Sequence, residues 1–267
     1  MDGVEVDTAA AADLVDLDRH PFDDAGRLAR CRAELAADGV TVLPGFLRPE
    51  TVAAMVAEVD RLAAVGHHST VEGTPYLDLP DDTWPEGHPR RALTRSALAA
   101  IAYDQFPADS PLRRLYEWDG LMAFIGELLD RRPLHRYADP LGALNVAVMG
   151  DGDELGWHFD MTDFVVSIAL QASTSGGAFE AVTNLRAEDD ERYDDVAAVL
   201  TGAAAGRVQA FPMTPGTLML FEGRRSLHRV TPVVGPVARY VALLAYDTRP
   251  DTDSSELLKL VRYGRSA

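Results

Sequence analysis

The stretch Gly156-Trp157-His158-Phe159-Asp160 decides how this chain folds and what it can bind. It follows the apolar run Leu144-Asn145-Val146-Ala147-Val148-Met149 and precedes the run from Phe164 to Gln171, and both runs are rich in residues that favour strands. The sequence therefore predicts that His158 and Asp160 lie where one strand gives way to the next.

A second imidazole and a cation follow later in the chain in a similar setting. His228 comes after the strand-like run Thr217-Leu218-Met219-Leu220-Phe221, and Arg239 lies in the next one, Val237 to Tyr246. Two imidazoles and one carboxylate suit a mononuclear Fe(II) ion, because they occupy one face of the metal and leave the other face open. The sequence therefore predicts a metal site formed by His158, Asp160 and His228.

This His-x-Asp, His and Arg order resembles that of the 2-oxoglutarate- and Fe(II)-dependent dioxygenases. The resemblance implies a mainly β fold with flanking helices around a double-stranded β-helix, that is, a cupin-like jelly roll. It also implies Fe(II) as cofactor, and 2-oxoglutarate and O2 as co-substrates. Arg239 is expected to hold the distal carboxylate of 2-oxoglutarate, since a guanidinium can donate two parallel hydrogen bonds to it. Asn145 is expected to hydrogen-bond the co-substrate, or else to be a satisfied core amide.

A narrower resemblance, to bacterial hydroxylases and radical halogenases of free amino acids, covers the chain from about Arg90 to Asp247. In those halogenases Gly or Ala replaces the metal-binding carboxylate and leaves room for chloride, whereas this chain has Asp160. The resemblance thus implies oxidation of an unactivated C–H bond of a small substrate, with release of succinate and CO2. Hydroxylation is the expected outcome, and desaturation or ring closure are alternatives. The segments that carry the resemblance are 138–145, 154–160, 176–180 and 228–233.

Candidate substrate contacts follow from strand alternation and from charge. Leu243, with its apolar neighbours two residues away on either side, is expected to share the interior face with Arg239. Asp139 could receive an ammonium group, and Arg91 or Arg95 could clamp a substrate carboxylate as part of a closing lid.

Composition excludes several partners. The formal net charge of −17 disfavours nucleic acid and anionic membranes, which would need a basic face. Cys31 is the single cysteine, so an intrachain disulfide is excluded, and neither a signal peptide nor a membrane span is apparent. We expect a cytoplasmic protein, monomeric or homodimeric, that acts on a small molecule.

The expected organisation is a single dioxygenase domain over residues 1–267. Residues 1–25 form a loosely ordered leader, 26–135 form mostly helical support with an irregular lid at 66–95, and 136–250 form the β-helix core. A charged loop and helix are expected at 186–203. The other helices are predicted at 25–37, 49–64, 96–103, 110–118 and 120–130.

Two other functions remain open at this stage. One is a cupin-like metalloenzyme that does not use 2-oxoglutarate, although cupins carry a His-x-His core with a further histidine. The other is a non-catalytic barrel that binds a small molecule, which the intact metal-ligand set and Arg239 disfavour.

Overall fold

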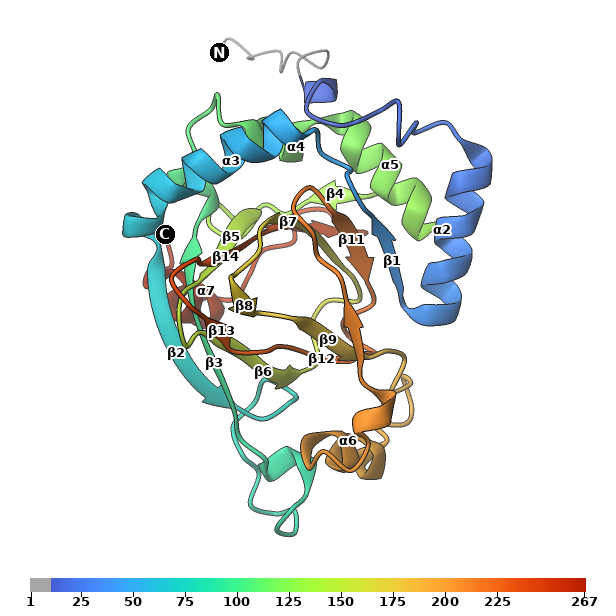
Figure 1. The fold of residues 1–267 in the computed structure, drawn as a ribbon. Helices are drawn as coiled ribbons and strands as arrows, with labels where there is room; N and C mark the ends of the chain where they lie inside the picture. Colours follow the sequence, from blue (N-terminus) through green and yellow to red (C-terminus); the bar gives the residue numbers. More distant parts are fainter. Residues whose placement is uncertain (1–10) are drawn as a thin grey trace.

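A large antiparallel sheet, curled on itself, forms the body of the computed structural model, which describes residues 11–267 (Figure 1). The sheet has eleven strands, with the order β1-β11-β7-β14-β5-β3-β6-β12-β9-β10 and with β2 paired to the other edge of β3. Consecutive strands of the chain are thus often far apart in the sheet, as in a jelly roll. The strands are β1 (Val40–Leu43), β2 (His67–Gly73), β3 (Thr94–Ile101), β5 (Leu144–Met149), β6 (Glu154–His158), β7 (Val165–Gln171), β9 (Phe179–Val182), β10 (Gln209–Phe211), β11 (Leu218–Phe221), β12 (Leu227–Val230) and β14 (Arg239–Leu244).

Two short ribbons complete the strands. Strand β8 (Ser175–Gly176) pairs with β13 (Val233–Val234), and β4 (His135–Arg136) pairs with β15 (Tyr246–Asp247). The mainly β, jelly-roll fold class predicted from the sequence is confirmed.

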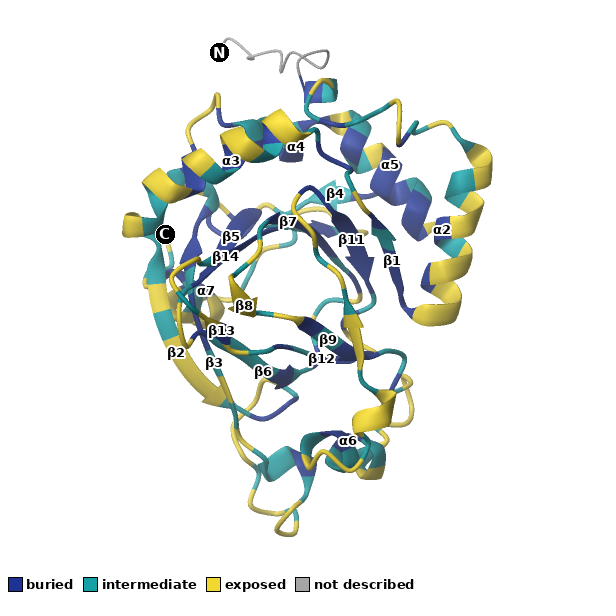
Figure 2. Ribbon diagram, in the orientation of Figure 1, coloured by how far each residue is buried: buried dark blue, intermediate teal, exposed yellow. Residues whose placement is uncertain are grey.

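Helices cover one side of the curled sheet, and side chains of the strands fill its interior. Helices α2 (Ala25–Asp38), α3 (Pro49–Leu62), α4 (Pro111–Glu117) and α5 (Asp119–Leu129) lie together over this side, with their inner faces buried and outer faces exposed (Figures 1 and 2). Helix α6 (Tyr193–Leu200) lies in the predicted charged insertion, and α7 (Glu256–Tyr263) ends the chain beside β2 and β3.

Strand alternation divides the side chains of the sheet between two apolar clusters. On β14, Tyr240, Ala242 and Leu244 join the cluster under the helices, whereas the alternate residues face the interior. The interior cluster contains Met149 of β5 and Phe221 of β11. The predicted period-two alternation of this strand is confirmed.

Local signals fix the helix ends that the sequence predicted. Asp24 accepts a hydrogen bond from the backbone N–H of Arg27 and so caps α2, and Gly39 ends that helix in the left-handed conformation. Ser110 caps α4 ahead of Pro111 in the same way.

The structure corrects the sequence prediction in the first half of the chain. Residues 96–103, predicted as a helix, belong mainly to strand β3, which lies between β2 on one edge and β5 and β6 on the other. Part of the predicted irregular lid, 66–95, is strand β2. Within the predicted loose leader, Val15 is fully buried and bridges to Leu47, while residues 1–10 lie outside the described residues. Among residues 11–267 no helix has the length and apolar character needed to cross a membrane.

Candidate metal centre

The pairing of β6 with β12 brings the two predicted imidazoles together. His228 is the register partner of His158, and their ring centroids lie 4.2 Å apart. The backbone then turns at the end of β6, and Asp160 N–H donates to the carbonyl of Gly223 at 3.1 Å. Ligand atoms of His158, Asp160 and His228 all lie within 4.8 Å of one another, which is close enough for one ion to bind all three.

Backbone contacts orient both imidazoles toward this point. Nδ1 of His158 lies 2.8 Å from the carbonyl oxygen of Gly156, and Nδ1 of His228 lies 2.9 Å from that of Ser226. Because a carbonyl oxygen only accepts, each Nδ1 carries the proton, and each Nε2 is free to bind a metal. The Asp160 carboxylate lies 3.7 Å from Nε2 of His158 and 3.4 Å from Nε2 of His228.

The electrostatics of the three groups suit a cation. Burial and the neighbouring His228 lower the pKa of His158 to about 4, so this ring is neutral at physiological pH. Burial disfavours the ionised form of Asp160, but His228 and His158 outweigh it and lower the pKa of this carboxyl. Asp160 Oδ2 is buried and makes no hydrogen bond within the described chain. Burial lowers the pKa of His228, but Asp160 outweighs this effect and raises the pKa, so a bound cation would replace a proton at Nε2 of this imidazole. A buried carboxylate oxygen without a donor, beside two imidazoles that present Nε2, fits a divalent ion.

Gly223 makes room for this carboxylate, and sequence reasoning missed it. A Cβ at position 223 would overlap the Asp160 side chain. No local pattern reveals this, because the two residues belong to different loops.

Arg239 enters the interior from the first position of β14. Only 7 % of its surface is exposed, and Nη1 approaches Sδ of Met149 at 3.7 Å. No carboxylate within the part of the chain that the structure describes lies within 4.0 Å of this guanidinium. Burial alone lowers the pKa of Arg239 to about 10. The protein thus holds a buried, uncompensated positive charge, which is costly unless an anion binds there.

The interior wall is more polar than the sequence indicated. Leu243 is the register partner of both Asn145 on β5 and Ser167 on β7, so these three residues form one row across the sheet. Asn145 Oδ1 and Ser167 Oγ are buried without a hydrogen-bond partner in the described structure. Two unsatisfied polar atoms in one row could hydrogen-bond a polar ligand. Sequence reasoning named Asn145 and Leu243 but missed Ser167, because this serine lies within an otherwise apolar, strand-like run.

The other candidate substrate contacts are already paired. Arg91 binds Asp82 at 3.0 Å, and Arg95 binds Glu154 at 3.0 Å. Arg95 also lies on the face of β3 opposite to Leu98, which packs in the interior cluster. Asp139 is buried and interacts with Lys259 at 3.6 Å.

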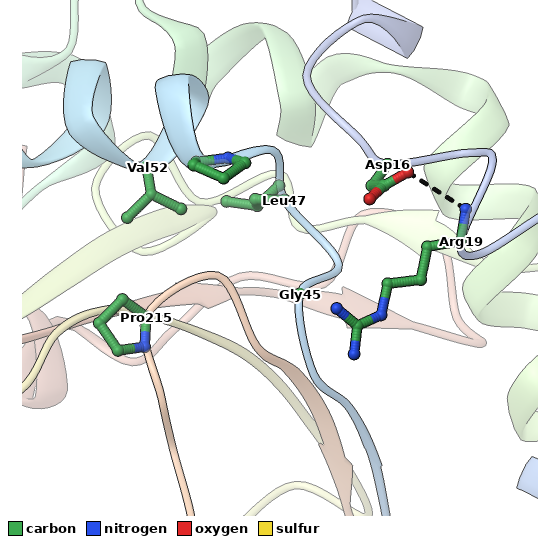
Figure 3. A pocket seen from close by; sticks show the side chains of 7 residues that line it. Asp16, Arg19, Gly45, Leu47, Val52 and Pro215 are labelled. Atoms are coloured by element: carbon green, nitrogen blue, oxygen red, sulfur yellow. Dashed lines mark hydrogen bonds between the residues drawn. The ribbon is translucent and has the colours of Figure 1, made fainter.

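A separate surface pocket lies on the helical side of the molecule, between the start of α3 and the loop around Pro215 (Figure 3). Its polar lining consists of Asp16 and Arg19, and no residue of the triad borders it. A more highly charged pocket includes Glu222 and Arg224, the residues on either side of Gly223, and no residue of the triad borders it.

Comparisons with known proteins agree with this fold. A family model described as Halogenase D matches residues 23–259. An oxidoreductase of the 2OG-Fe(II) oxygenase family from Burkholderia pseudomallei is 17% identical with a TM-score of 0.52, covering 85% of this chain and 93% of that chain. A search of curated protein sequences found no match.

Two further solved structures have a similar fold. SnoN, a non-heme alpha ketoglutarate dependent epimerase from nogalamycin biosynthesis, is 17% identical with a TM-score of 0.55, covering 84% of this chain and 83% of that chain. AviO1 from Streptomyces viridochromogenes is 20% identical with a TM-score of 0.55, covering 82% of this chain and 93% of that chain.

Proposed function

This chain belongs to the halogenase D family, whose model matches residues 23–259, and we propose that it is an Fe(II)-, 2-oxoglutarate- and O2-dependent oxygenase of a small molecule. The structural neighbours named as 2OG-Fe(II) oxygenase and alpha ketoglutarate dependent epimerase share its fold and support the proposal.

The observation that carries the proposal is the combination of the metal-ligand triad with the buried, unpaired Arg239. A cupin-like metalloenzyme also needs a set of metal ligands, but it has no use for an uncompensated guanidinium in its interior. A dicarboxylate accounts for both features, because one end can reach the metal while the other receives two charge-assisted hydrogen bonds from Arg239. Asn145 and Ser167 offer further polar contacts on the same interior face of the sheet.

When bound, Fe(II) would supply the redox chemistry by which O2 oxidises both 2-oxoglutarate, to succinate and CO2, and a substrate C–H bond. The residues of this chain hold the reactants in place. His158 and His228 keep their protons at Nδ1 and present Nε2, and Asp160 contributes one negative charge. The apolar side chains of Met149 and Phe221 line the interior near the site and exclude water.

Hydroxylation is the proposed outcome, and a free amino acid is the proposed substrate class. With a metal bound, Asp160 would take the coordination position that a halide needs, and Gly223 accommodates its carboxylate. The amino-acid class rests on the resemblance of segments 138–145, 154–160, 176–180 and 228–233.

The test is an anaerobic ultraviolet–visible titration of the Fe(II)-loaded protein with 2-oxoglutarate. We expect a weak visible charge-transfer band that requires 2-oxoglutarate and is lost in Arg239→Gln and Asp160→Ala. Arg249→Gln is the matched control, because Arg249 is exposed on the surface. Addition of the proteinogenic L-amino acids one at a time should shift the band with the substrate. If Fe(II) binds and 2-oxoglutarate produces no band, the co-substrate assignment is wrong.

A further inference from the structure

Arg186 lies in the charged insertion between β9 and α6, and its side chain is mostly buried. Only 15 % of the side chain is exposed, whereas Arg192 and Arg207 of the same insertion are 56 % and 49 % exposed. Arginine usually keeps its charged end in water, so a mostly buried one indicates specific partners. The partners of Arg186 belong to the two segments of the chain that carry the metal ligands.

The first contacts join Arg186 to the turn between β11 and β12, residues 223–226. Nε of Arg186 donates to the carbonyl of Arg224 at 2.7 Å, and the backbone N–H of Arg186 donates to the carbonyl of Arg225 at 3.1 Å. A side chain and the backbone of the same residue thus attach this turn to the insertion.

The same turn contacts two of the three predicted metal ligands. The carbonyl of Gly223 accepts the backbone N–H of Asp160 at 3.1 Å, and the missing side chain at Gly223 leaves the space that the Asp160 carboxylate fills. The carbonyl oxygen of Ser226 lies 2.9 Å from Nδ1 of His228 and orients that imidazole. A shift of the turn would therefore displace Asp160 and His228 together.

The second contact joins Arg186 to the segment that carries the other imidazole. Its guanidinium carbon lies 4.1 Å from the ring centroid of Phe159, the residue between His158 and Asp160. Phe159 is almost fully buried, and a cation–π contact is strongest where water is excluded. Glu191 accepts a hydrogen bond from Nη1 at 2.8 Å and helps to hold the guanidinium over the ring. One guanidinium therefore packs against both segments that carry metal ligands.

We propose that Arg186 is a positioning residue of the metal site, which holds the turn 223–226 against Phe159 and so fixes Asp160 and His228 relative to each other. This inference rests on the proposed function and extends it, because it assigns a residue of the insertion to the geometry of the metal centre. The charge of Arg186 alone would have the opposite effect on metal affinity, since a positive charge repels a cation. The sign of the change on removing Arg186 therefore separates positioning from charge.

The test measures Co(II) affinity by competition titration in wild type, Arg186→Met, Arg186→Lys and the control Arg207→Met. Met removes the charge and the hydrogen-bond donors, whereas Lys keeps the charge and loses the planar group. Arg207 lies in the same insertion and pairs with Asp195 at 2.8 Å. Its replacement therefore also removes one positive charge and one ion pair.

We expect Arg186→Met to weaken Co(II) binding about 10- to 100-fold, as for other residues that orient metal ligands. The affinity of Arg186→Lys should lie between those of wild type and Arg186→Met, and Arg207→Met should match wild type. The visible absorption of Co(II) reports its coordination, so at saturation the spectrum should change in Arg186→Met and not in Arg207→Met. A residue that only stabilised the fold would lower the unfolding midpoint and leave this spectrum unchanged.

A second measurement needs no metal. In the apo protein, the backbone N–H of Asp160 should exchange with solvent at least about 10-fold faster in Arg186→Met than in wild type, because its acceptor on Gly223 moves with the turn. The N–H of Ala245, which lies between β14 and β15 and donates to Ala143 at 2.9 Å, should exchange at the wild-type rate.

Three results in Arg186→Met would overturn the inference. They are unchanged or tighter Co(II) binding, a wild-type Co(II) spectrum, and unchanged exchange at Asp160. If this variant does not fold, wild-type affinity and spectrum in Arg186→Lys would overturn it equally. Failure of the proposed function has a different signature, because wild type would then not bind Co(II), whereas exchange at Asp160 would still depend on Arg186.

Discussion

Replacing Arg239 with Met should stabilise the protein without ligands and abolish its stabilisation by 2-oxoglutarate. Burial lowers the pKa of Arg239 from 12.5 to about 10, so holding the charged form in the folded protein costs about 3 kcal/mol. Met keeps most of the side-chain volume and removes the charge. At about 2–4 °C per kcal/mol, the unfolding midpoint of the apo protein should rise by roughly 6–12 °C as an upper bound.

Thermal unfolding of metal-loaded protein with and without 2-oxoglutarate checks both halves of this prediction. At a ligand concentration of 100 times Kd, wild type should gain about 2.7 kcal/mol, and Arg239→Met should gain nothing. Arg249→Met is the control, since Arg249 is exposed and should show wild-type behaviour in both conditions. A less stable apo Arg239→Met protein, or one that 2-oxoglutarate still stabilises, would refute the argument that this charge is kept for an anionic ligand.

Three other predictions test the site and its support. Gly223→Ala should weaken Co(II) affinity about 10- to 100-fold in a competition titration, because the new methyl group displaces the Asp160 carboxylate. Gly206→Ala, with no atom near its added Cβ, should leave it unchanged, and normal affinity in both variants would contradict the packing argument. Co(II) at 100 times Kd should stabilise the apo protein by about 2.7 kcal/mol, and Asp160→Ala should lose this gain in thermal unfolding. Glu58 accepts a hydrogen bond from Ser110 at 2.7 Å, and burial raises the pKa of its carboxyl. The contribution of Glu58 to stability is therefore present below pH 4.5 and is lost as the pH rises through the pKa of this carboxyl in the folded protein. Glu58→Gln should therefore raise the unfolding midpoint at pH 8 but not at pH 4, and an equal effect at both values would exclude this titration as the cause.

Strong local patterns predicted the second half of the fold. The run Leu144 to Met149 became strand β5 with the predicted bounds, because β-formers and flanking turns agree there. The helix prediction for residues 96–103 was wrong, because the alanines of this segment favour a helix locally, whereas pairing with β2, β5 and β6 stabilises a strand. That pairing depends on residues distant in sequence, and the local secondary-structure propensity of a segment does not include them.

The site divides in the same way. The residue types and order of His158, Asp160, His228 and Arg239 predicted the triad that the structure assembles and the buried guanidinium. The contributions of Gly223 and Ser167 were missed, because each depends on a neighbour from a distant part of the chain. Arg91 and Arg95 had the right chemistry, but acidic neighbours already bind both.

The family model that matches this chain is described as Halogenase D, whereas the carboxylate of Asp160 supports the proposed oxygenase. A halide would need the coordination position that Asp160 occupies. A Cβ at position 223 would overlap the Asp160 carboxylate. The glycine at this position therefore allows the carboxylate to lie where it does. The nitrogens of both imidazoles also lie within 3.7 Å of its oxygens, so the carboxylate is already in place for a shared ion. Asp160 and Gly223 thus form one arrangement, and this arrangement supports the proposed metal site with three protein ligands.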